Sequence, residues 1–368
     1  MLTGHGGNIH QLAQRLGCPT DEISDMSSNL NPLGPPAGLE TFLMQNTALI
    51  RSLPPVDAGP MVEAFCRYNG VEAGRVAAGN GTTWFITTLP QVLNTKHMLI
   101  MGPTYSEYKD ACVMYGSDFS FCMAEPDTGF EPDMHLLSSI LSRSEKTIDT
   151  VVICNPNNPT GALIDKNSIR DVADSHPGVF FVIDESYLPF VDNADAVSLV
   201  RENRYANLIV LSSMSKIFCM PGLRTGFVCA SPWVIERFMM YYQPWSVNAP
   251  AQAAVAYLYD NSALIEQFTE QTRIYIKKEK QLFTDMLEDC SHLKIFPSQT
   301  CFVLAKLQGS MTSDEFCHIA AQKKILIRDC ANFDGLSDQF VRFSLKTRGE
   351  NARLAALTGA IMETKILA

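Results

Sequence analysis

The chain has 368 residues, of which 46% are hydrophobic, and it carries a formal net charge of −10. This length is enough for a large domain and a smaller one, each burying a core of its own. An acidic surface repels the phosphates of nucleic acids and of anionic lipids, so we expect neither as a partner. The longest apolar runs are strand-sized, so we expect no membrane span and a cytoplasmic protein.

The 11 cysteines are scattered along the chain, and none belongs to a Cys-x-x-Cys pair. The paired spacing of metal ligands is therefore missing, and so is a secretory signal that would favour disulfides. We expect reduced, mostly buried cysteines and no bound metal.

Residues 1–35 are polar and rich in Gly, Asn and Pro, which predicts an arm with a short helix and not a domain. We expect this arm to pack on the small domain and the active site. Residues 36–250 are expected to form the large domain. Its strands are predicted from continuous apolar runs bounded by turn residues, at 97–101, 151–154, 180–184 and 208–211. Such runs are typical of strands buried on both faces of a parallel sheet, with helices such as 166–174 as crossovers.

The remaining residues, 251–368, are expected to hold a connecting helix and a small C-terminal domain. The pattern over 255–288 predicts one long helix, possibly bent, followed by strands near 301–307 and 339–345. The fold class is therefore α/β. In open α/β sheets, ligands bind beyond the carboxyl ends of the strands, so functional residues should directly follow the predicted strands.

A lysine follows the last of these strands, in the Ser-Ser-Met-Ser-Lys segment 212–216. Most lysines are solvated surface charges, but Lys216 gains weight from Arg224, eight residues further on and beside Thr225. An arginine beside hydroxyl groups can hold a phosphate, while a neighbouring lysine amine can condense with an aldehyde.

An aspartate, Asp184, stands at the end of the predicted strand 180–184. A buried carboxylate is costly unless it meets a cation, and the protonated pyridine nitrogen of pyridoxal phosphate is such a cation. The alternative is an aspartate that caps the following helix. Tyr187 would donate a hydrogen bond to the 3'-oxygen that is attached to the pyridine ring.

Two further segments and one tyrosine are candidates for contacts with the same cofactor. Residues 155–161 (Asn-Pro-Asn-Asn-Pro-Thr-Gly) form a turn whose amide would also reach the ring oxygen. Residues 78–83 (Ala-Gly-Asn-Gly-Thr-Thr) open a predicted helix, 84–93, and offer backbone N–H groups to a phosphate. They lack the spacing of a dinucleotide-binding loop. Tyr105 would stack on a flat ring or serve as a core aromatic.

The order of these features resembles the fold-type I pyridoxal-phosphate-dependent aminotransferase superfamily over essentially the whole chain. The resemblance implies a large domain with a mostly parallel sheet flanked by helices, a smaller C-terminal α/β domain, pyridoxal phosphate as cofactor, and a homodimer. It makes Lys216 the Schiff-base lysine and Asp184 the partner of the pyridine nitrogen. It also implies cofactor contacts from Gly81, Thr82, Tyr105, Asn158, Tyr187, Ser213, Ser215 and Arg224.

Segments 4–8, 29–34, 244–249 and 327–332 narrow the resemblance to the histidinol-phosphate aminotransferase branch and, within it, to the L-threonine-O-3-phosphate decarboxylases. These enzymes make aminopropanol phosphate for the nucleotide loop of cobalamin. The implied substrate is a small anion, O-phospho-L-threonine or, as a second choice, O-phospho-L-serine. The implied substrate contacts are His5, Gly6, Gly7, Asn31, Asn158, Asn248, Arg328 and Arg342.

The chain departs from the family pattern at two positions. Leu53 stands where relatives have a tyrosine that reaches the partner subunit's cofactor, and Thr82 stands where relatives have an acidic residue. Two other functions remain open on this resemblance, a true aminotransferase and a non-catalytic regulator that binds pyridoxal phosphate. Residues 213–216 also match the Ser-x-x-Lys motif of penicillin-recognising enzymes, but the companion motifs of those enzymes are missing from the sequence.

Overall fold

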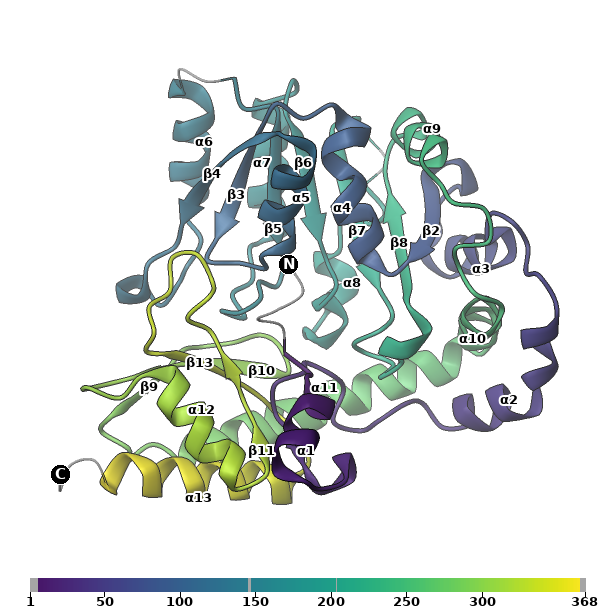
Figure 1. Cartoon of the computed structure of the whole chain (residues 1–368). Coiled ribbons are helices and arrows are strands. Elements are labelled where there is room, and N and C mark those ends of the chain that lie inside the picture. The colour runs from purple at the N-terminus through teal and green to yellow at the C-terminus, as the bar shows by residue number, and fades with distance from the viewer. Residues whose placement is uncertain (1–5, 145–146, 203, 365–368) are drawn as a thin grey trace.

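The computed structural model describes residues 6–144, 147–202 and 204–364, and a seven-stranded sheet forms the centre of its larger part (Figure 1). The strand order in this sheet is β2-β8-β7-β6-β5-β3-β4. The strands are β2 (Val76–Asn80), β3 (His97–Gly102), β4 (Asp118–Met123), β5 (Thr150–Cys154), β6 (Phe180–Asp184), β7 (Leu208–Ser213) and β8 (Thr225–Cys229).

The sheet is mostly parallel. Strands β4, β3, β5, β6 and β7 run parallel to one another, whereas β8 is antiparallel to both of its neighbours, β2 and β7. The predicted α/β class and the four predicted strands are therefore confirmed. Because the parallel strands point the same way, their carboxyl ends meet at one edge of the sheet.

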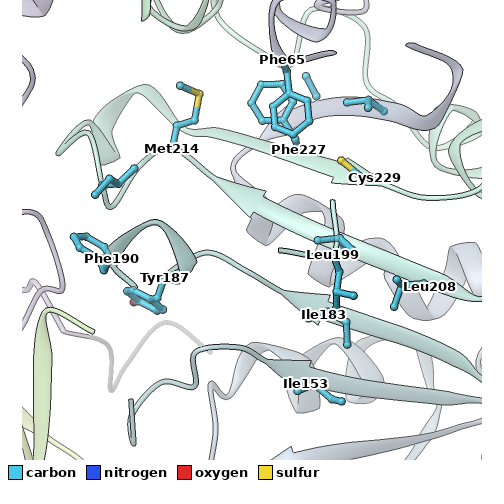
Figure 2. Close-up of a cluster of buried hydrophobic side chains, with 14 of the residues drawn as sticks. Phe65, Ile153, Ile183, Tyr187, Phe190, Leu199, Leu208, Met214, Phe227 and Cys229 are labelled. Atoms are coloured by element: carbon cyan, nitrogen blue, oxygen red, sulfur yellow. The ribbon is translucent and has the colours of Figure 1, made fainter. Parts of the chain in front are cut away.

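Helices cover both faces of this sheet, which explains why its strands read as continuous apolar runs. Along β6, Phe181 and Ile183 face one core and Val182 faces the other. Figure 2 shows part of the first core, where Phe65 stacks on Phe227 at 4.2 Å between ring centroids. The flanking helices are α3 (Gly59–Asn69), α4 (Thr82–Leu93), α5 (Glu107–Tyr115), α6 (Met134–Arg143), α7 (Lys166–Ser175), α9 (Pro232–Met240) and α10 (Ala249–Asp260).

A second, four-stranded antiparallel sheet of order β12-β13-β10-β9 lies in the C-terminal part of the chain. Its strands are β9 (Leu293–Ile295), β10 (Phe302–Leu307), β12 (Arg328–Asp329) and β13 (Phe340–Ser344). The helices α11 (Ser262–Asp285), α12 (Ser313–Gln322) and α13 (Arg348–Thr364) accompany it (Figure 1).

The N-terminal segment packs against this C-terminal part. Strand β1 (Ser24–Asp25) pairs in parallel with β11 (Ile325–Leu326), although some 300 residues separate them in the chain. Helix α1 (Ile9–Leu16) contributes Leu12 and Ala13 to a small apolar cluster that includes Ala321 of α12. The pairing directs residues 27–29, which follow β1, toward the space between the two sheets.

The prediction of one helix over 255–288 is wrong, because the chain forms α10 and α11 with a break at Asn261. Asn261 has φ −111° and ψ 53°, outside the helical region, and its side-chain amide donates to the Tyr257 carbonyl at 2.7 Å. The residue thus ends one helix and begins the next. The apolar pattern continues through the break, so periodicity alone gave no sign of it.

All 11 cysteines are free, and seven of them are buried. Within the described ranges, no helix is long and apolar enough to cross a membrane.

Candidate active site

Residues from four separate loops meet at the carboxyl edge of the seven-stranded sheet. Tyr105 follows β3, Asn158 follows β5, Tyr187 follows β6 and Lys216 follows β7. These four side chains line two adjoining pockets at once. We call the pockets the Asp184 pocket and the Arg342 pocket, each after a charged residue that lines that pocket and not the other.

The Asp184 pocket has a volume of about 190 Å³. Every residue for which the sequence predicted a cofactor contact lines it, namely Gly81, Thr82, Tyr105, Asn158, Asp184, Tyr187, Ser213, Ser215, Lys216 and Arg224. Segments spread over more than 140 residues of sequence are therefore brought to one place by the fold.

One end of this pocket is suited to an anion. Gly81 precedes the first turn of α4 with φ +77°, and a Cβ atom there would meet Nη2 of Arg224 at 2.7 Å. A Cβ atom on Gly226 would meet the backbone nitrogen of Thr82 at 2.4 Å, so only glycine lets β8 pass this close. The guanidinium of Arg224 therefore lies beside a helix N-terminus, where N–H groups lack partners within the helix and the dipole favours negative charge.

Asp184 is a buried carboxylate that is held by hydrogen bonds. Its Oδ2 accepts from the Tyr108 hydroxyl at 2.8 Å, and its Oδ1 accepts from the Ser186 N–H at 2.9 Å. Burial raises the pKa of Asp184, while the bonds from Ser186 and Tyr108 and the charge of Lys216 oppose that rise. The bond to Ser186 shows that Asp184 also stabilises the local turn. It does not cap the following helical turn, 188–190, whose N-cap position is Tyr187 and has no side-chain cap bond.

The hydroxyl of Ser186 also lines the Asp184 pocket, where it is buried close to the Asp184 carboxylate and lowers the pKa of that group. A hydroxyl and a carboxylate that are buried side by side fit a pocket built for a polar ligand.

The amine of Lys216 lies in an environment that disfavours its charge. Burial lowers its pKa to about 8, and the positive charges of Arg342, Arg224 and Lys346 act in the same direction. The neutral amine, which is the form that attacks a carbonyl carbon, is therefore more populated near pH 8 than in an ordinary lysine.

The Tyr187 hydroxyl and the Asn158 amide connect the site to the rest of the chain. Tyr187 accepts a hydrogen bond from Nδ2 of Asn29 at 3.1 Å, and Asn29 in turn accepts from Ser344 of β13 at 2.5 Å. The amide oxygen of Asn158 accepts from Arg342, also on β13. Because Arg342 and Ser344 are two residues apart on a strand, both side chains point to the same face.

The Arg342 pocket has a volume of about 170 Å³ and is lined by Gly6, by 27–29 and by two arginines. Arg342 is 4% exposed and donates through Nη2 to the Ser27 carbonyl at 2.6 Å. Its Nε is buried without a partner among the described residues. None of the described residues that line this pocket carries a carboxylate, so its positive charge is available to an anion.

Arg328 is the second arginine of this pocket, and its neighbours hold it in place. It donates to the Asp329 carbonyl at 2.5 Å and to the side-chain oxygen of Asn332 at 2.8 Å. Its guanidinium carbon lies 4.9 Å from the centre of the Phe333 ring. A guanidinium oriented in this way can bind a phosphate or carboxylate through its remaining N–H groups.

Some predicted substrate contacts lie elsewhere. Asn31 lines neither pocket, because its amide donates to the Ile217 carbonyl at 2.7 Å and supports the loop of Lys216. Asn248 caps α10 and donates to the Leu223 carbonyl at 3.0 Å. The Gly7 N–H donates to Ser27 Oγ at 2.7 Å, and among the described residues of this motif, 6–8, Gly6 alone lines the Arg342 pocket. His5 lies outside the described residues.

The sequence reasoning missed several residues of the site. Tyr108, Asn29 and Asn332 contact a predicted site residue directly. Asn29 and Asn332 stand inside the segments that carried the family resemblance, so their motifs were a usable signal. Tyr108 gave no signal of its own, because a tyrosine on a helix three residues after Tyr105 reads as an ordinary core aromatic.

Comparison with known proteins agrees with this geometry. Residues 26–361 match the model of the family described as aminotransferase class I and II. The threonine-phosphate decarboxylase of Salmonella typhimurium is 28% identical over 96% of this chain and 95% of its own length. The adenosylcobalamin biosynthesis bifunctional protein CobDQ of Leptospira interrogans is 30% identical over 96% of this chain, which spans only 40% of that longer protein.

Two solved structures have the same fold with similar coverage. L-threonine-O-3-phosphate decarboxylase from Porphyromonas gingivalis matches with a TM-score of 0.81 and 28% identity, over 93% of this chain and 99% of its own. Histidinol-phosphate aminotransferase from Clostridium acetobutylicum matches with a TM-score of 0.83 and 26% identity, over 93% of this chain and 100% of its own.

The fold and the two pockets define a fold-type I enzyme that depends on pyridoxal phosphate. The chain belongs to the aminotransferase class I and II family.

Tyr108→Phe tests the hydrogen bond to Asp184. Removing a hydrogen bond to a charged group costs about 1.5–3 kcal/mol, so the charged form of Asp184 loses stabilisation and its pKa rises further. We expect the pH titration of the cofactor's visible absorbance to shift by about one unit or more. The measurement is a spectrophotometric titration of the holoenzyme.

Tyr115→Phe is the matched control, because Tyr115 lies on the same helix α5 and is 40% exposed. Identical titrations of wild type, Tyr108→Phe and Tyr115→Phe would show that Tyr108 has no influence on Asp184.

Proposed function

We propose that this protein is a cytoplasmic decarboxylase that converts O-phospho-L-threonine to (R)-1-aminopropan-2-yl phosphate, a step of cobalamin synthesis. The observation that carries the proposal is the pair Arg328 and Arg342, which line one pocket together with Lys216. A phospho-amino acid carries two anionic groups, and each arginine can hold one of them. The similarity to threonine-phosphate decarboxylases supports the same substrate.

The Asp184 pocket fits the cofactor. Lys216 is the candidate for the covalent attachment, and Asp184 would keep the pyridine nitrogen protonated. Tyr187 and Asn158 would hold the ring oxygen, and Tyr105 would lie on the ring face. The phosphate would be held at the helix N-terminus by Gly81, Thr82, Ser213, Ser215 and Arg224.

Bound pyridoxal phosphate supplies an electron sink for the bond that breaks at the substrate Cα. The residues of this chain determine which bond that is, because the anchors fix the orientation of the substrate. Arg342, held by Ser27 and Asn158, would bind the carboxylate, and Arg328, held by Asn332, would bind the phosphate. Lys216 lines both pockets, so its amine is placed to return a proton to Cα after carbon dioxide leaves.

The second candidate is an aminotransferase acting on histidinol phosphate. It is favoured by relatives such as the histidinol-phosphate aminotransferase of Methanococcus aeolicus, 24% identical over 97% of this chain. The same two arginines would then serve the phosphate of the donor and a carboxylate of the acceptor. The two reactions differ in the bond held perpendicular to the cofactor ring, Cα–COO⁻ or Cα–H.

We also propose that the protein is a homodimer. Five apolar side chains near the segment 44–56 are strongly exposed, namely Met44, Ile50, Leu53, Val56 and Trp245. The backbone N–H of Trp245 donates to the Val56 carbonyl at 3.0 Å, which joins the chain at Trp245 to the segment 44–56. An apolar patch of several large side chains is typical of an interface.

Sedimentation velocity should therefore give twice the mass of one chain. Ile50→Asp should weaken the dimer, because it places a charge in the apolar patch. Ile274→Asp, at a position 60% exposed on α11, serves as the control. A fully active particle with the mass of one chain would contradict the proposal.

Lys216 is tested by reduction of the holoenzyme with borohydride, which should fix the cofactor to this lysine. Lys280 is an internal control, because burial also lowers its pKa to about 8 but it lines neither pocket. Mass spectrometry of the digest should find the label on Lys216 and not on Lys280. Lys216→Ala should abolish turnover, and a label on any other lysine would refute the assignment.

The substrate is tested by carbon dioxide release from phosphothreonine, phosphoserine and threonine without a keto acid. The methyl group should matter by only about 1–3 kcal/mol, so phosphoserine should react more slowly but measurably. Free threonine should react far more slowly, because Arg328 would be left unpaired.

Arg328→Ala should reduce kcat/KM for phosphothreonine by about 30-fold or more, as expected for truncating one partner of a desolvated charge pair. Arg67→Ala, at an exposed surface ion pair, is the control. Equal rates for threonine and phosphothreonine would contradict the phosphate anchor. Reaction with histidinol phosphate and a keto acid in place of carbon dioxide release would identify the aminotransferase.

A further inference from the structure

A third cavity lies beside the active site and is larger than either of its pockets, with a volume of about 380 Å³. We call it the Glu185 cavity. It is bounded by α3, by 185–200, by the segment 212–218 and by the start of α11. Ser213 lines both this cavity and the Asp184 pocket, so the two spaces lie on opposite sides of the segment that carries Lys216.

One wall of the Glu185 cavity is aromatic. Tyr68 and Tyr259 lie with ring centroids 4.9 Å apart, and Phe65 meets Tyr259 edge-on at 5.9 Å. Met214 and Phe218 continue the apolar surface, and Figure 2 shows Phe65 and Met214 extending from different elements. Aromatic faces carry a negative quadrupole, so a wall of this kind favours an apolar body that bears a positive charge.

The charged residues of the cavity are mainly acidic. Asp195, Glu266 and Glu270 line it at exposed positions, and the described lining contains a single basic residue, Arg273. The charge of Arg273 already has partners within the chain. Its Nε donates to the Pro189 carbonyl at 3.0 Å, and its Nη1 lies 3.8 Å from Oε2 of Glu270. Burial raises the pKa of Tyr68, and the negative charges of Asp195 and Glu266 raise it further, while the positive charges of Arg273 and Arg201 oppose that rise.

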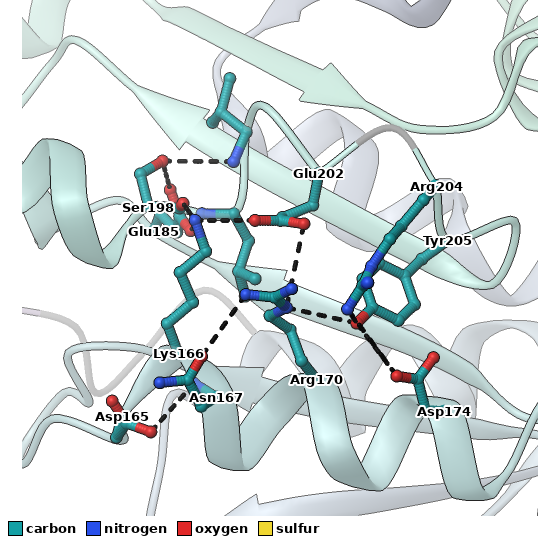
Figure 3. A network of polar contacts seen from close by, with 12 residues as sticks. Asp165, Lys166, Asn167, Arg170, Asp174, Glu185, Ser198, Glu202, Arg204 and Tyr205 are labelled. Atoms are coloured by element: carbon teal, nitrogen blue, oxygen red, sulfur yellow. Dashed lines mark hydrogen bonds and ion pairs between the residues drawn. The ribbon is translucent and has the colours of Figure 1, made fainter.

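The fourth carboxylate, Glu185, is buried in the floor of the cavity. Its Oε1 accepts from the Leu199 N–H at 2.6 Å, and its Oε2 accepts from Ser198 Oγ at 2.7 Å (Figure 3). Burial raises the pKa of Glu185 to about 7, so a positive charge in the cavity would stabilise its ionised form. This carboxylate adjoins Asp184 in sequence but belongs to a different space.

We propose that the Glu185 cavity binds an organic cation with an apolar body, held by the aromatic wall and the surrounding carboxylates. The volume lies in the range of small-molecule sites, and the charge is opposite to that of the Arg342 pocket, which selects anions. The proposal is independent of which reaction the active site catalyses.

The test uses isothermal titration of the holoenzyme with 3-phenylpropyl-trimethylammonium. A quaternary ammonium is chosen because it cannot condense with the cofactor aldehyde, as a primary amine would. The neutral and anionic analogues are 3-phenylpropanol and 3-phenylpropanoate. We expect saturable one-to-one binding of the cation, weaker binding of the alcohol and none of the carboxylate, with the cation's affinity falling as salt increases.

Two variants locate the site. The double variant Glu266→Gln and Glu270→Gln should weaken cation binding about fivefold, since each exposed charge contributes up to about 0.5 kcal/mol. Its matched control is Glu236→Gln with Glu288→Gln, two exposed glutamates outside the cavity. Thr269→Phe should fill the cavity and abolish binding of the cation. The Thr269 hydroxyl donates to the carbonyls of Ile265 and Glu266 in its own helix, so the substitution leaves the backbone hydrogen bonds of that helix in place.

Equal binding of cation and alcohol would overturn the proposal, and so would unchanged affinity in the Glu266→Gln, Glu270→Gln variant. Competition of the cation by phosphothreonine would also overturn it, because the probe would then occupy the active site.

Discussion

The burial of the Asp184 carboxylate is the constraint on which the rest of the site depends. At the end of β6 the carboxylate is buried, and its ionised form is stabilised by hydrogen bonds from Ser186 and Tyr108 and by the positive charge of Lys216. Burial acts on Lys216 in the opposite sense and lowers its pKa to about 8. One desolvated pocket therefore contains a carboxyl group and an amine that both resist ionisation. A cationic ring and an aldehyde would relieve both costs at once.

The positive charge of the Arg342 pocket depends on contacts between distant segments. Arg342 is on β13, yet its guanidinium is held by Ser27 of the N-terminal segment and by Asn158 of the loop after β5. Asn29 links the same segment to Tyr187. The pocket is therefore complete only when the arm, the large sheet and the small sheet are assembled together. This arrangement makes the N-terminal segment part of the site, and not merely a support for it.

Much of the fold was predictable because each parallel strand is buried on both faces and so leaves a continuous apolar run. The cofactor residues were predictable because ligands bind where such strands end. The break between α10 and α11 was not predictable, because the apolar pattern continues on both sides of Asn261. Asn31 and Asn248 were predicted as substrate contacts from their motifs, but their amides stabilise the loops of Lys216 and Arg224. A motif identifies a position that matters without saying which way its side chain points.

The sequence by itself determined the class of the fold, the family, the cofactor and the set of side chains around the Asp184 pocket. These follow from local patterns, that is, from apolar runs, the turns that end them and the residue types that follow. Only the tertiary structure decided that Tyr108 supports Asp184, that Asn332 orients Arg328, and that Glu185 faces a separate cavity although it follows Asp184 directly. Such contacts depend on the direction of each side chain and on neighbours far away in sequence, which no local pattern records.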